Sequence, residues 1–411
     1  MSAQNSDGKI GAVVAGCGGR GVWFASQAFT KDNYELLGLV DSIPGRAELT
    51  REHIGAEGVP VFDSVAEAVE RTGCDALLLA TPDCEHASGA LEALKRGRHV
   101  YIEKPMSTTL EDCLSIIRAD KDAGGKAFVG FNLRYAPVYR AVRKMMREGR
   151  IGRTLTIQTD EFYYGGRTYF RRWNRFRAKG GGLWITKSCH DFDILYWLAD
   201  SLPKRVCASS ALTYYRPRQD AARLCRDCKL KETCPDCYFK GGRIDPDSFT
   251  WKMAQLREEA GEDPADLCLW NSEKDTFDHA AASVDFRGDI LTTHSVNVVA
   301  SMSDRRVRVS GTDGMLDGDH RSGTVTYYQR HGAEPEEVEL DTSGGHGGGD
   351  RKIMDDFAEF VRGRISSPIP PPQAGVAVAI GLAARLSADR RQAVDMDDLE
   401  GWRELVDCLS D

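Results

Sequence analysis

The side chains best suited to chemistry are those of Lys104, Lys187 and His190. His190 titrates nearest neutral pH, so its imidazole is the natural acceptor for the proton of a hydroxyl group. Lys187 lies three positions earlier, and on a helix two residues at this spacing share a face. Lys104 lies just past an expected strand end, where its ammonium group can reach a substrate oxygen. We therefore predict that His190 takes the hydroxyl proton, that Lys104 polarises the same oxygen, and that Lys187 positions the substrate or shares the proton.

These residues also have structural interpretations. Lys104 can pair with Glu103 in a surface turn, because most lysines are solvated. His190 can be a hydrogen-bonded histidine at the start of a helix. If Lys104 and Lys187 lie close together, each lowers the pKa of the other, and one of them becomes a possible base. The chemical interpretation requires that the three side chains converge.

A glycine-rich loop follows the first expected strand and opens a helical segment. It reads Gly16-Cys17-Gly18-Gly19-Arg20-Gly21. Glycines at this spacing permit a tight turn, the close approach of a pyrophosphate and close packing of helix on sheet. The helix N-terminus then faces the phosphates with unpaired N–H groups. The alternative is a glycine turn in an unrelated α/β domain.

Asp41 ends the second expected strand, 20 residues after Gly21, where a carboxylate accepts hydrogen bonds from the adenine ribose. Its charge repels the 2′-phosphate of NADP, so the sequence favours NAD. Arg20 and Arg46 keep NADP open as the less favoured cofactor, since a nearby arginine binds such a phosphate.

Short apolar strands alternate with helical segments over the first third of the chain. The expected strands are Ile10–Ala15, Glu35–Val40, Val59–Phe62, Ala76–Ala80, His99–Ile102 and Ala127–Phe131. Strands separated by helices of this length indicate βαβ units, a parallel sheet and right-handed crossovers. We predict an α/β, doubly wound Rossmann domain that binds NAD(P) over residues 1–132.

The pattern changes after residue 132 to longer strands with period-two character. These are Thr154–Glu161, Ala281–Phe286, Ile290–Val298 and Thr324–Gln329, with helices expected at Cys189–Leu198, Arg351–Arg362 and Gln373–Leu386. We expect the proline run at 368–372 to lie outside the last helix. Residues 133–411 are predicted to form an α+β domain for substrate binding and oligomerisation. Its sheet should be open, largely antiparallel and flanked by helices, with a cysteine-rich insertion at about 214–266.

Several motifs converge on one resemblance. They are Thr81-Pro82 with His86, Glu103-Lys104-Pro105, the segment 130–135, Gly180-Gly181-Gly182, and His190-Asp191-Phe192-Asp193. With the glycine loop, this set resembles the Gfo/Idh/MocA family, the glucose–fructose oxidoreductase and inositol dehydrogenase group, over about residues 9–395. The resemblance implies the two-domain fold above and NAD(P)-dependent oxidation or reduction of a sugar, glycoside, cyclitol or similar polyol. It also includes a departure, because many members carry an aspartate where this chain has Thr186. The segment is similar to a branch with a Lys-x-x-His arrangement.

The resemblance and the motifs together assign the remaining candidate residues. Cofactor contacts are expected from Gly16, Gly18, Gly19, Arg20, Gly21, Asp41, Thr81, Pro82, His86, Glu103 and Lys104. Substrate contacts are expected from Arg134, Tyr163, Arg172, Trp173, Asp193 and His279. Aromatic faces and bidentate donors suit a carbohydrate pocket, although the same mixture also occurs on solvated loops. Pro105 is a candidate for a cis peptide bond.

One dense cysteine cluster stands apart from these motifs. It consists of Cys225, Cys228, Cys234 and Cys237, two pairs that can wrap a tetrahedral zinc ion. The five residues between the pairs are fewer than such zinc sites usually have, so free or disulfide-linked cysteines and an iron–sulfur cluster stay open. We expect a structural zinc site in a lid or an oligomer contact, away from the chemistry.

Composition narrows the function classes. The chain has 411 residues, 54 basic and 62 acidic, for a net charge of −8, which argues against nucleic-acid or membrane partners. No secretory signal is visible in the first nine residues, so a cytoplasmic protein is expected. An open sheet face predicts a homodimer or homotetramer. The alternatives to a dehydrogenase are a redox-neutral glycoside hydrolase or lyase with tightly bound NAD, and a non-catalytic binding protein on the same scaffold.

Overall fold

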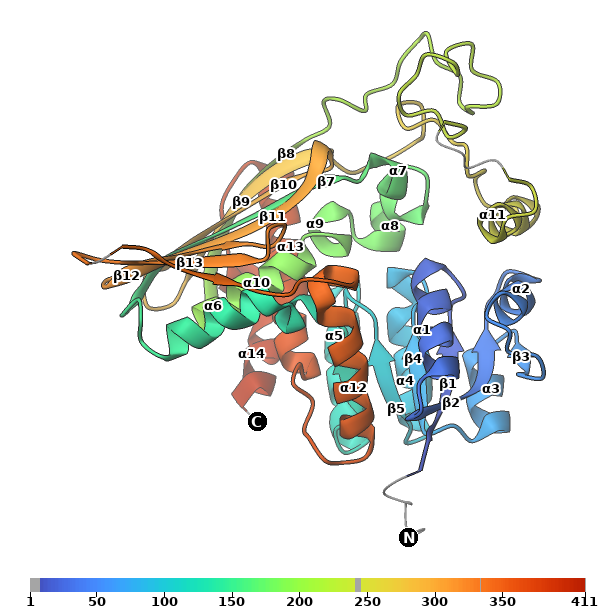
Figure 1. Ribbon diagram of the computed structural model, residues 1–411, viewed down its shortest axis with the longest axis horizontal. Coiled ribbons are helices and arrows are strands. Elements are labelled where there is room, and N and C mark those ends of the chain that lie inside the picture. Colours follow the sequence, from blue (N-terminus) through green and yellow to red (C-terminus); the bar gives the residue numbers. More distant parts are fainter. Residues whose placement is uncertain (1–7, 241–244, 333, 411) are drawn as a thin grey trace.

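The computed structural model describes residues 8–240, 245–332 and 334–410. Its first sheet has six parallel strands in the order β3-β2-β1-β4-β5-β6 (Figure 1). The strands are β1 (Ile10–Ala15), β2 (Tyr34–Val40), β3 (Val61–Phe62), β4 (Ala76–Leu79), β5 (His99–Ile102) and β6 (Ala127–Val129). The helices between them are α1 (Gly19–Thr30), α2 (Arg46–His53), α3 (Val65–Thr72), α4 (His86–Lys95) and α5 (Leu110–Asp122). Every residue of β1 and β4 is buried, because helices cover both faces, and the predicted Rossmann fold is confirmed.

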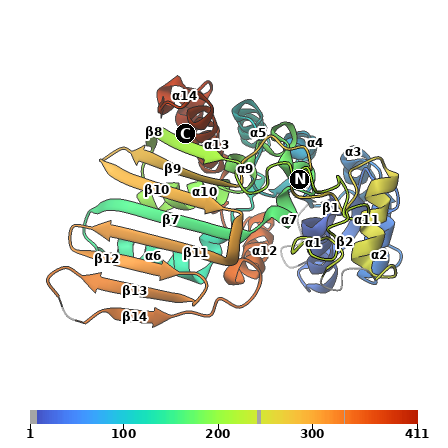
Figure 2. The same ribbon diagram turned by 90° about the horizontal axis from the view of Figure 1, so that it is seen from above.

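The second sheet has nine strands in the order β14-β13-β12-β11-β7-β10-β9-β8-β15 (Figure 2). They are β7 (Thr154–Tyr164), β8 (Pro203–Ala211), β9 (His279–Phe286), β10 (Ile290–Asn297), β11 (Val299–Gly311), β12 (Gly314–Asp319), β13 (Thr324–Gln329), β14 (Glu336–Glu339) and β15 (Val394–Asp395). Neighbouring strands are antiparallel, except that β7 and β10 run parallel. The predicted largely antiparallel sheet is confirmed.

Helices cover only one face of this second sheet. The helices of this half are α6 (Pro137–Arg147), α7 (Gly166–Tyr169), α8 (Arg177–Gly180), α9 (Leu183–Thr186), α10 (Cys189–Ala199), α11 (Phe249–Glu259), α12 (Gly349–Val361), α13 (Pro371–Arg390) and α14 (Trp402–Ser410). Of these, α6, α10 and α13 lie against the sheet, and no helix of the described residues covers the opposite face (Figure 1). In β7 the side chains of Ile157, Thr159 and Glu161 are buried beneath the helices, whereas the alternate residues face outward.

The proline run differs from the prediction. Pro371 and Pro372 are the first two residues of α13, not part of a preceding loop. The first turn of a helix tolerates proline because its N–H groups have no intrahelical partner, and the fixed φ suits the helix. The helix therefore begins two residues before the expected Gln373.

The C-terminal part of the chain returns to the first sheet. Phe357 of α12 packs edge-on against Tyr101 and Phe128 of that sheet, with ring centroids 5.4 and 5.5 Å apart. The hydroxyl of Tyr34 donates a hydrogen bond to the carbonyl oxygen of Met354 at 2.7 Å. Helix α12 thus helps to cover a sheet formed by the first third of the chain, and a boundary near residue 132 stays a prediction.

A long segment, residues 212–278, connects β8 to β9 and crosses back toward the first sheet. In the described part of this segment the only α-helix is α11. Its Phe249 ring stacks on His53 of α2, with centroids 3.8 Å apart, and Figure 1 shows the two helices side by side. We call residues 212–278 the connecting segment. Among the described residues, no helix has both the length and the apolar character that crossing a membrane requires.

Candidate active site

The glycine loop has the shape that a dinucleotide pyrophosphate needs. Gly16 has φ of +88°, and a Cβ there would lie 2.5 Å from the carbonyl oxygen of Ala80. A Cβ at Gly21 would lie 1.6 Å from the carbonyl oxygen of Gly16, so both positions require glycine. Gly19, in contrast, faces open space, a Cβ at Gly18 would meet only the Arg46 guanidinium at 3.5 Å, and no side chain caps the N-terminus of α1. Phosphate oxygens can therefore approach the backbone N–H groups of the loop and helix.

Asp41 is fixed beside this loop at the end of β2. Its Oδ2 accepts a hydrogen bond from the N–H of Cys17 at 2.7 Å, and its Oδ1 accepts one from the N–H of Ile43 at 2.9 Å. A guanidinium nitrogen of Arg46 lies 3.5 Å from Oδ1. The carboxylate thus stands where the ribose of a dinucleotide would bind, and Arg46 is the arginine that accompanies it.

Arg20, a predicted cofactor contact, pairs with two carboxylates of other elements. Its Nε donates to Glu103 Oε1 at 2.5 Å, and its Nη2 lies 2.9 Å from Asp350. The guanidinium also lies over the ring of Trp23, 4.2 Å from the centroid. Burial lowers the pKa of Arg20, but the neighbouring carboxylates outweigh burial and hold it above its ordinary value. Arg20 thus links α1, β5 and α12.

Lys104 lies at the carboxyl end of β5, where two turns are held together by His86. The peptide bond between Lys104 and Pro105 is cis, as predicted. His86 Nδ1 lies 2.7 Å from the carbonyl oxygen of Pro105, and its Nε2 lies 3.1 Å from the carbonyl oxygen of Thr81. The Nζ of Lys104 donates to the carbonyl oxygen of Thr186 at 3.0 Å. This bond joins the edge of the first sheet to α9 of the second half.

Lys187 is held by a buried ion-pair cluster. Its Nζ lies 2.5 Å from Glu161 Oε1 and 4.6 Å from the ring centroid of Tyr163. Glu161 also pairs with Arg305, whose Nη2 lies 3.5 Å from Asp191. Burial raises the pKa of Glu161, but Arg305 and Lys187 outweigh it and hold the pKa below its ordinary value. The ammonium of Lys187 is therefore neutralised by a fixed carboxylate.

His190 lies in the first turn of α10, buried and packed edge-on against Phe131 at 6.1 Å. Lys187 is not on this helix, because α9 ends at Thr186 and α10 begins at Cys189. The prediction that Lys187 and His190 share a helical face is thus wrong. The backbone N–H of His190 instead donates to the carbonyl oxygen of Lys187 at 3.4 Å, which keeps the two residues together across the break.

Two of the predicted substrate residues bind each other. Arg134 donates from Nε and Nη2 to the two carboxylate oxygens of Asp193 at 2.8 and 2.6 Å, and from Nη1 to Gln373 at 3.0 Å. The side chains of Arg134 and Asp193 are 5% and 0% exposed. Such a bidentate, buried pair braces α10 against α13 and the turn at 132–135.

The other predicted substrate residues lie on two different faces. Tyr163 packs against Lys187, and Arg172 and Trp173 follow in the loop between α7 and α8, where Arg172 is exposed. His279 begins β9, and its side chain is 47% exposed and 2.8 Å from Asp278. Since Ala280 and Ala282 point to the buried face, His279 points to the uncovered face of the sheet, away from His190. His279 therefore lies apart from Lys104, Lys187 and His190.

Family models match two long segments of this chain. The oxidoreductase family model with an NAD-binding Rossmann fold matches residues 10–131, and the model for the C-terminal alpha/beta domain of the same family matches residues 143–396. The chain belongs to the Gfo/Idh/MocA oxidoreductase family. It is an NAD-binding oxidoreductase, and the resemblance noted in the sequence is confirmed.

Individual relatives agree with this family assignment. YteT of Bacillus subtilis (strain 168) is 30% identical over 79% of this chain and 82% of its own length. The scyllo-inositol 2-dehydrogenase (NAD(+)) of the same strain is 28% identical over 46% of this chain and 54% of its own length. Among solved structures, the scyllo-inositol dehydrogenase of Lactobacillus casei with bound NAD(H) and scyllo-inositol has a TM-score of 0.69 at 17% identity. That match covers 95% of this chain and all of the other.

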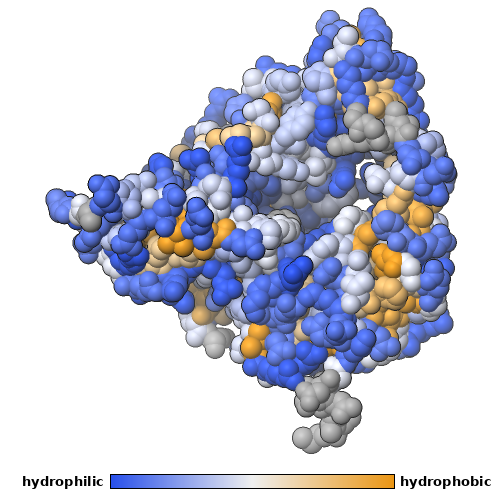
Figure 3. Space-filling view, in the orientation of Figure 1, coloured by the Kyte–Doolittle hydropathy of each residue, from blue (hydrophilic) through white to orange (hydrophobic). Residues whose placement is uncertain are grey.

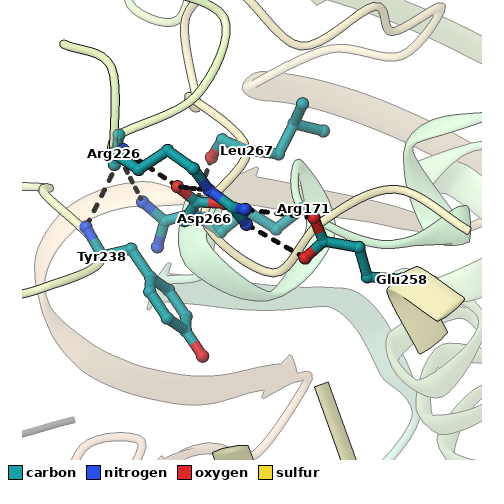
Figure 4. Close-up of polar contacts among 7 residues, drawn as sticks. Arg171, Arg226, Tyr238, Glu258, Asp266 and Leu267 are labelled. Carbon is teal, nitrogen blue, oxygen red and sulfur yellow. Dashed lines mark hydrogen bonds and ion pairs between the residues drawn. The ribbon is translucent and has the colours of Figure 1, made fainter. Parts of the chain in front are cut away.

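The connecting segment of this family member is anchored by arginines. Arg171 donates to the carbonyl oxygens of Leu267 and Asp236 at 2.8 and 2.7 Å, which ties the segment to the loop after α7. Figure 4 shows Arg226 bridging Asp266 and Glu258, with Nη2 distances of 2.7 and 3.0 Å. The surface is hollowed beneath this segment, between it and the first sheet (Figure 3).

The predicted metal ligands surround one small cavity in this segment. Cys225, Cys228, Cys234 and Cys237 line it together with Cys268, and its volume of about 20 Å³ is near that of one water molecule. In the part of the chain that the structure describes, no three His, Cys, Asp or Glu side chains are grouped so that they could hold a metal ion. No disulfide joins the described cysteines. The zinc site is therefore not supported and stays a prediction.

Sequence reasoning missed the acidic residues that flank the two lysines. Glu161, which also binds Arg305, holds Lys187, and Asp83 lies buried in the turn after β4, next to the strand that leads to Lys104. A signal for Asp83 was present, because it directly follows Thr81-Pro82 at the carboxyl end of a strand, where ligands of open α/β sheets bind. No local sequence pattern indicated the ion pair of Arg305 with Glu161, because the two residues lie 144 positions apart.

Proposed function

We propose that this chain is an NAD-dependent dehydrogenase that oxidises a hydroxyl group of a sugar, glycoside or cyclitol. The observation that carries the proposal is the contact of Lys104 with Thr186 at the carboxyl edge of the dinucleotide-binding sheet. It brings Lys104 to the segment that carries Lys187 and His190. Relatives named as inositol dehydrogenases support the substrate class.

The residues divide the work of such a reaction. Bound NAD supplies the hydride acceptor, and the glycine loop and Asp41 hold its pyrophosphate and adenine ribose. His190 takes the proton of the reacting hydroxyl, because an imidazole titrates near neutral pH. Lys104 donates a hydrogen bond to the same oxygen. Lys187, neutralised by Glu161, is the cation that positions the substrate and is not the proton acceptor.

A redox-neutral hydrolase or lyase with tightly bound NAD is the second candidate. The connecting segment favours it, because α11 packs on α2 beside the end of the site that holds Asp41. A Cβ at Gly45 would meet the Leu256 side chain of α11 at 3.2 Å. A segment fastened there would slow the release of the dinucleotide, as a retained cofactor requires.

One experiment separates the two candidates. The protein is denatured directly after purification and its supernatant is analysed for NAD by mass spectrometry, while NADH absorbance is followed with scyllo-inositol, other cyclitols, sugars and glycosides. Substrate-dependent NADH accumulation by protein purified without NAD supports the dehydrogenase. Co-purified NAD with substrate turnover but no NADH accumulation supports the redox-neutral enzyme. A Lys104→Met variant with full activity would remove Lys104 from either reaction.

We also propose that the uncovered face of the second sheet is buried by a partner subunit in a homodimer or homotetramer. Phe162, Leu291 and Tyr328 project from this face and are 37%, 54% and 39% exposed. Large apolar side chains gathered on one face are typical of subunit contacts. Sedimentation at micromolar concentration tests this, and a monomer contradicts it.

The acidic net charge and the cysteines without disulfides support a cytoplasmic enzyme with no nucleic-acid partner.

A further inference from the structure

Asp83 is a buried carboxyl group that the proposed reaction does not yet use. It follows Thr81-Pro82 at the end of β4, begins a short 3₁₀ turn, and is 5% exposed. No described residue donates a hydrogen bond to its Oδ2. Burying a carboxylate costs free energy unless charge or hydrogen bonds compensate. The compensation must therefore come from nearby groups or from a bound molecule.

His86 holds the turn of Asp83 beside the turn of Lys104. The two turns follow β4 and β5, which are neighbouring parallel strands. His86, three residues after Asp83, has one ring nitrogen 3.1 Å from the carbonyl oxygen of Thr81 and the other 2.7 Å from that of Pro105. Lys104 Nζ in turn donates to the carbonyl oxygen of Thr186 at 3.0 Å. The buried carboxyl group and the lysine are thus carried on two turns whose backbones are fastened to each other.

Other charges near the lysines are already paired. Arg20 binds Glu103, and Glu161 binds Lys187. Lys104 is the cation that acts most strongly on Asp83. Burial raises the pKa of Asp83 and Lys104 lowers it in part, so that the pKa is about 7. A carboxyl group with this pKa gains its charge near neutral pH.

We propose that Asp83 is the positioning residue of Lys104. Ionised, its carboxylate stabilises the ammonium form of Lys104 and keeps it oriented for the substrate oxygen, and protonated, it no longer does so. The assignment of Lys104 to a substrate oxygen rests on the proposed function, whereas the coupling of Asp83 to Lys104 does not. The carboxylate lacking at Thr186 is in this way supplied from the first sheet.

The coupling can be measured without a substrate. The intact protein is treated briefly with acetic anhydride between pH 6 and 9, and acetylation of Lys104 relative to the exposed Lys204 is quantified by peptide mass spectrometry. Acetic anhydride reacts with the neutral amine. An opposite charge nearby raises a lysine pKa by about one unit or more, so Asp83→Asn should speed acetylation of Lys104 about tenfold at pH 8. Glu85→Gln, an exposed charge removal in the same turn, is the matched control and should leave the relative rate unchanged.

The pH dependence separates an electrostatic role from a purely structural one. In the unaltered protein, relative acetylation of Lys104 should fall behind that of Lys204 as pH rises through about 7, because Asp83 ionises there. Asp83→Asn should abolish this inflection, and Asp83→Glu should restore it. The other titratable groups that sense Asp83 or act on it are Glu103, Cys84, Cys189 and Tyr169. Burial raises the pKa of Cys189 to about 12, and it raises those of Cys84 and Tyr169 as well.

Two results would overturn the proposal. One is an unaltered protein without the inflection near pH 7. The other is an Asp83→Asn variant, folded by circular dichroism, in which Lys104 reacts at the original rate at every pH. Absence of dehydrogenase activity in the panel would count against the proposed function and would leave both of these measurements standing. Where turnover is found, the same inflection should be present in kcat/KM and absent in Asp83→Asn.

Discussion

Replacing Glu161 with glutamine tests whether the ion-pair cluster around Lys187 is structurally as important as its burial indicates. The cluster contains two cations, Lys187 and Arg305, and two carboxylates, Glu161 and Asp191. Their side chains are 12%, 11%, 6% and 0% exposed. Glu161→Gln keeps the size of the side chain but removes one negative charge. Lys187 then loses its carboxylate partner, and Arg305 keeps only Asp191 at 3.5 Å.

The expected cost follows from this burial. Removing one partner of a buried pair leaves an uncompensated charge in a poorly solvated site, which typically costs about 3–5 kcal/mol. The lowered pKa of Glu161 also indicates that its charge stabilises the fold. The folded-state pKa of Glu161 is lowered, so its stabilisation is present above the pKa of the unfolded chain and is lost as pH falls through the folded value. At pH 7 the unaltered protein therefore has the full stabilisation, and Glu161→Gln lacks it.

Urea unfolding at pH 7, followed by tryptophan fluorescence, measures this difference. The matched control is Asp160→Asn, one position earlier on β7 and on its outer face, where burial raises the carboxyl pKa and the charge contributes no stability. That control should change the unfolding free energy by less than about 1 kcal/mol. Glu161→Gln with Lys187→Met should recover part of the loss, because the remaining charges again balance. A Glu161→Gln protein as stable as Asp160→Asn would refute the reasoning.

Three further variants address the cofactor end and the helix brace. Asp41→Asn should weaken NAD binding about tenfold or more, because a hydrogen bond to a charged group contributes about 1.5–3 kcal/mol. The variant should also prefer NAD over NADP less strongly. Fluorescence titration with both dinucleotides measures the two affinities. Arg134→Met should destabilise the fold by about 3–5 kcal/mol by leaving Asp193 unpaired, and Arg134→Met with Asp193→Leu should restore most of it in thermal melts. Phe249→Ala should speed NAD release several-fold, and it should cost little stability because α11 has no buried residue. Stopped-flow measures the release rate. An unchanged rate would show that α11 does not retain the dinucleotide.

The first sheet was predictable because its signals are local. Strands β1 and β5 have the predicted bounds, and the glycine loop and Asp41 lie where the motif spacing placed them. A parallel strand covered by helices is an uninterrupted apolar run, and a left-handed turn demands glycine, so a few consecutive residues suffice in each case. The break between α9 and α10 has no such signal. No glycine or proline separates Thr186 from Cys189, and a continuous helical face for Lys187 and His190 was the natural but wrong prediction.

Strands that carry charged residues were harder to recognise. β11 contains Asp304, Arg305 and Arg306, a composition typical of a loop. Arg305 nevertheless points inward, because it forms an ion pair with Glu161 of β7. The pair is joined by sheet register, which no local pattern encodes. His279 illustrates the reverse case. The alternation of β9 would have placed it on the outer face if the predicted strand had begun at residue 279 instead of 281.

The placement of carboxylates explains how this chain can function with threonine at position 186. A carboxylate at that position would lie at the end of α9, where Lys104 donates its hydrogen bond to the carbonyl oxygen of residue 186. Here Glu161 reaches Lys187 from β7, and Asp83 is held near Lys104 from the end of β4. Each lysine thus lies near a different acidic residue, and the two acidic residues come from different elements. The pKa of Glu161 is lowered, whereas that of Asp83 is raised. In the proposed reaction Lys187, paired with Glu161, is the cation that positions the substrate, whereas the charge near Lys104 responds to pH, and His190 takes the substrate proton.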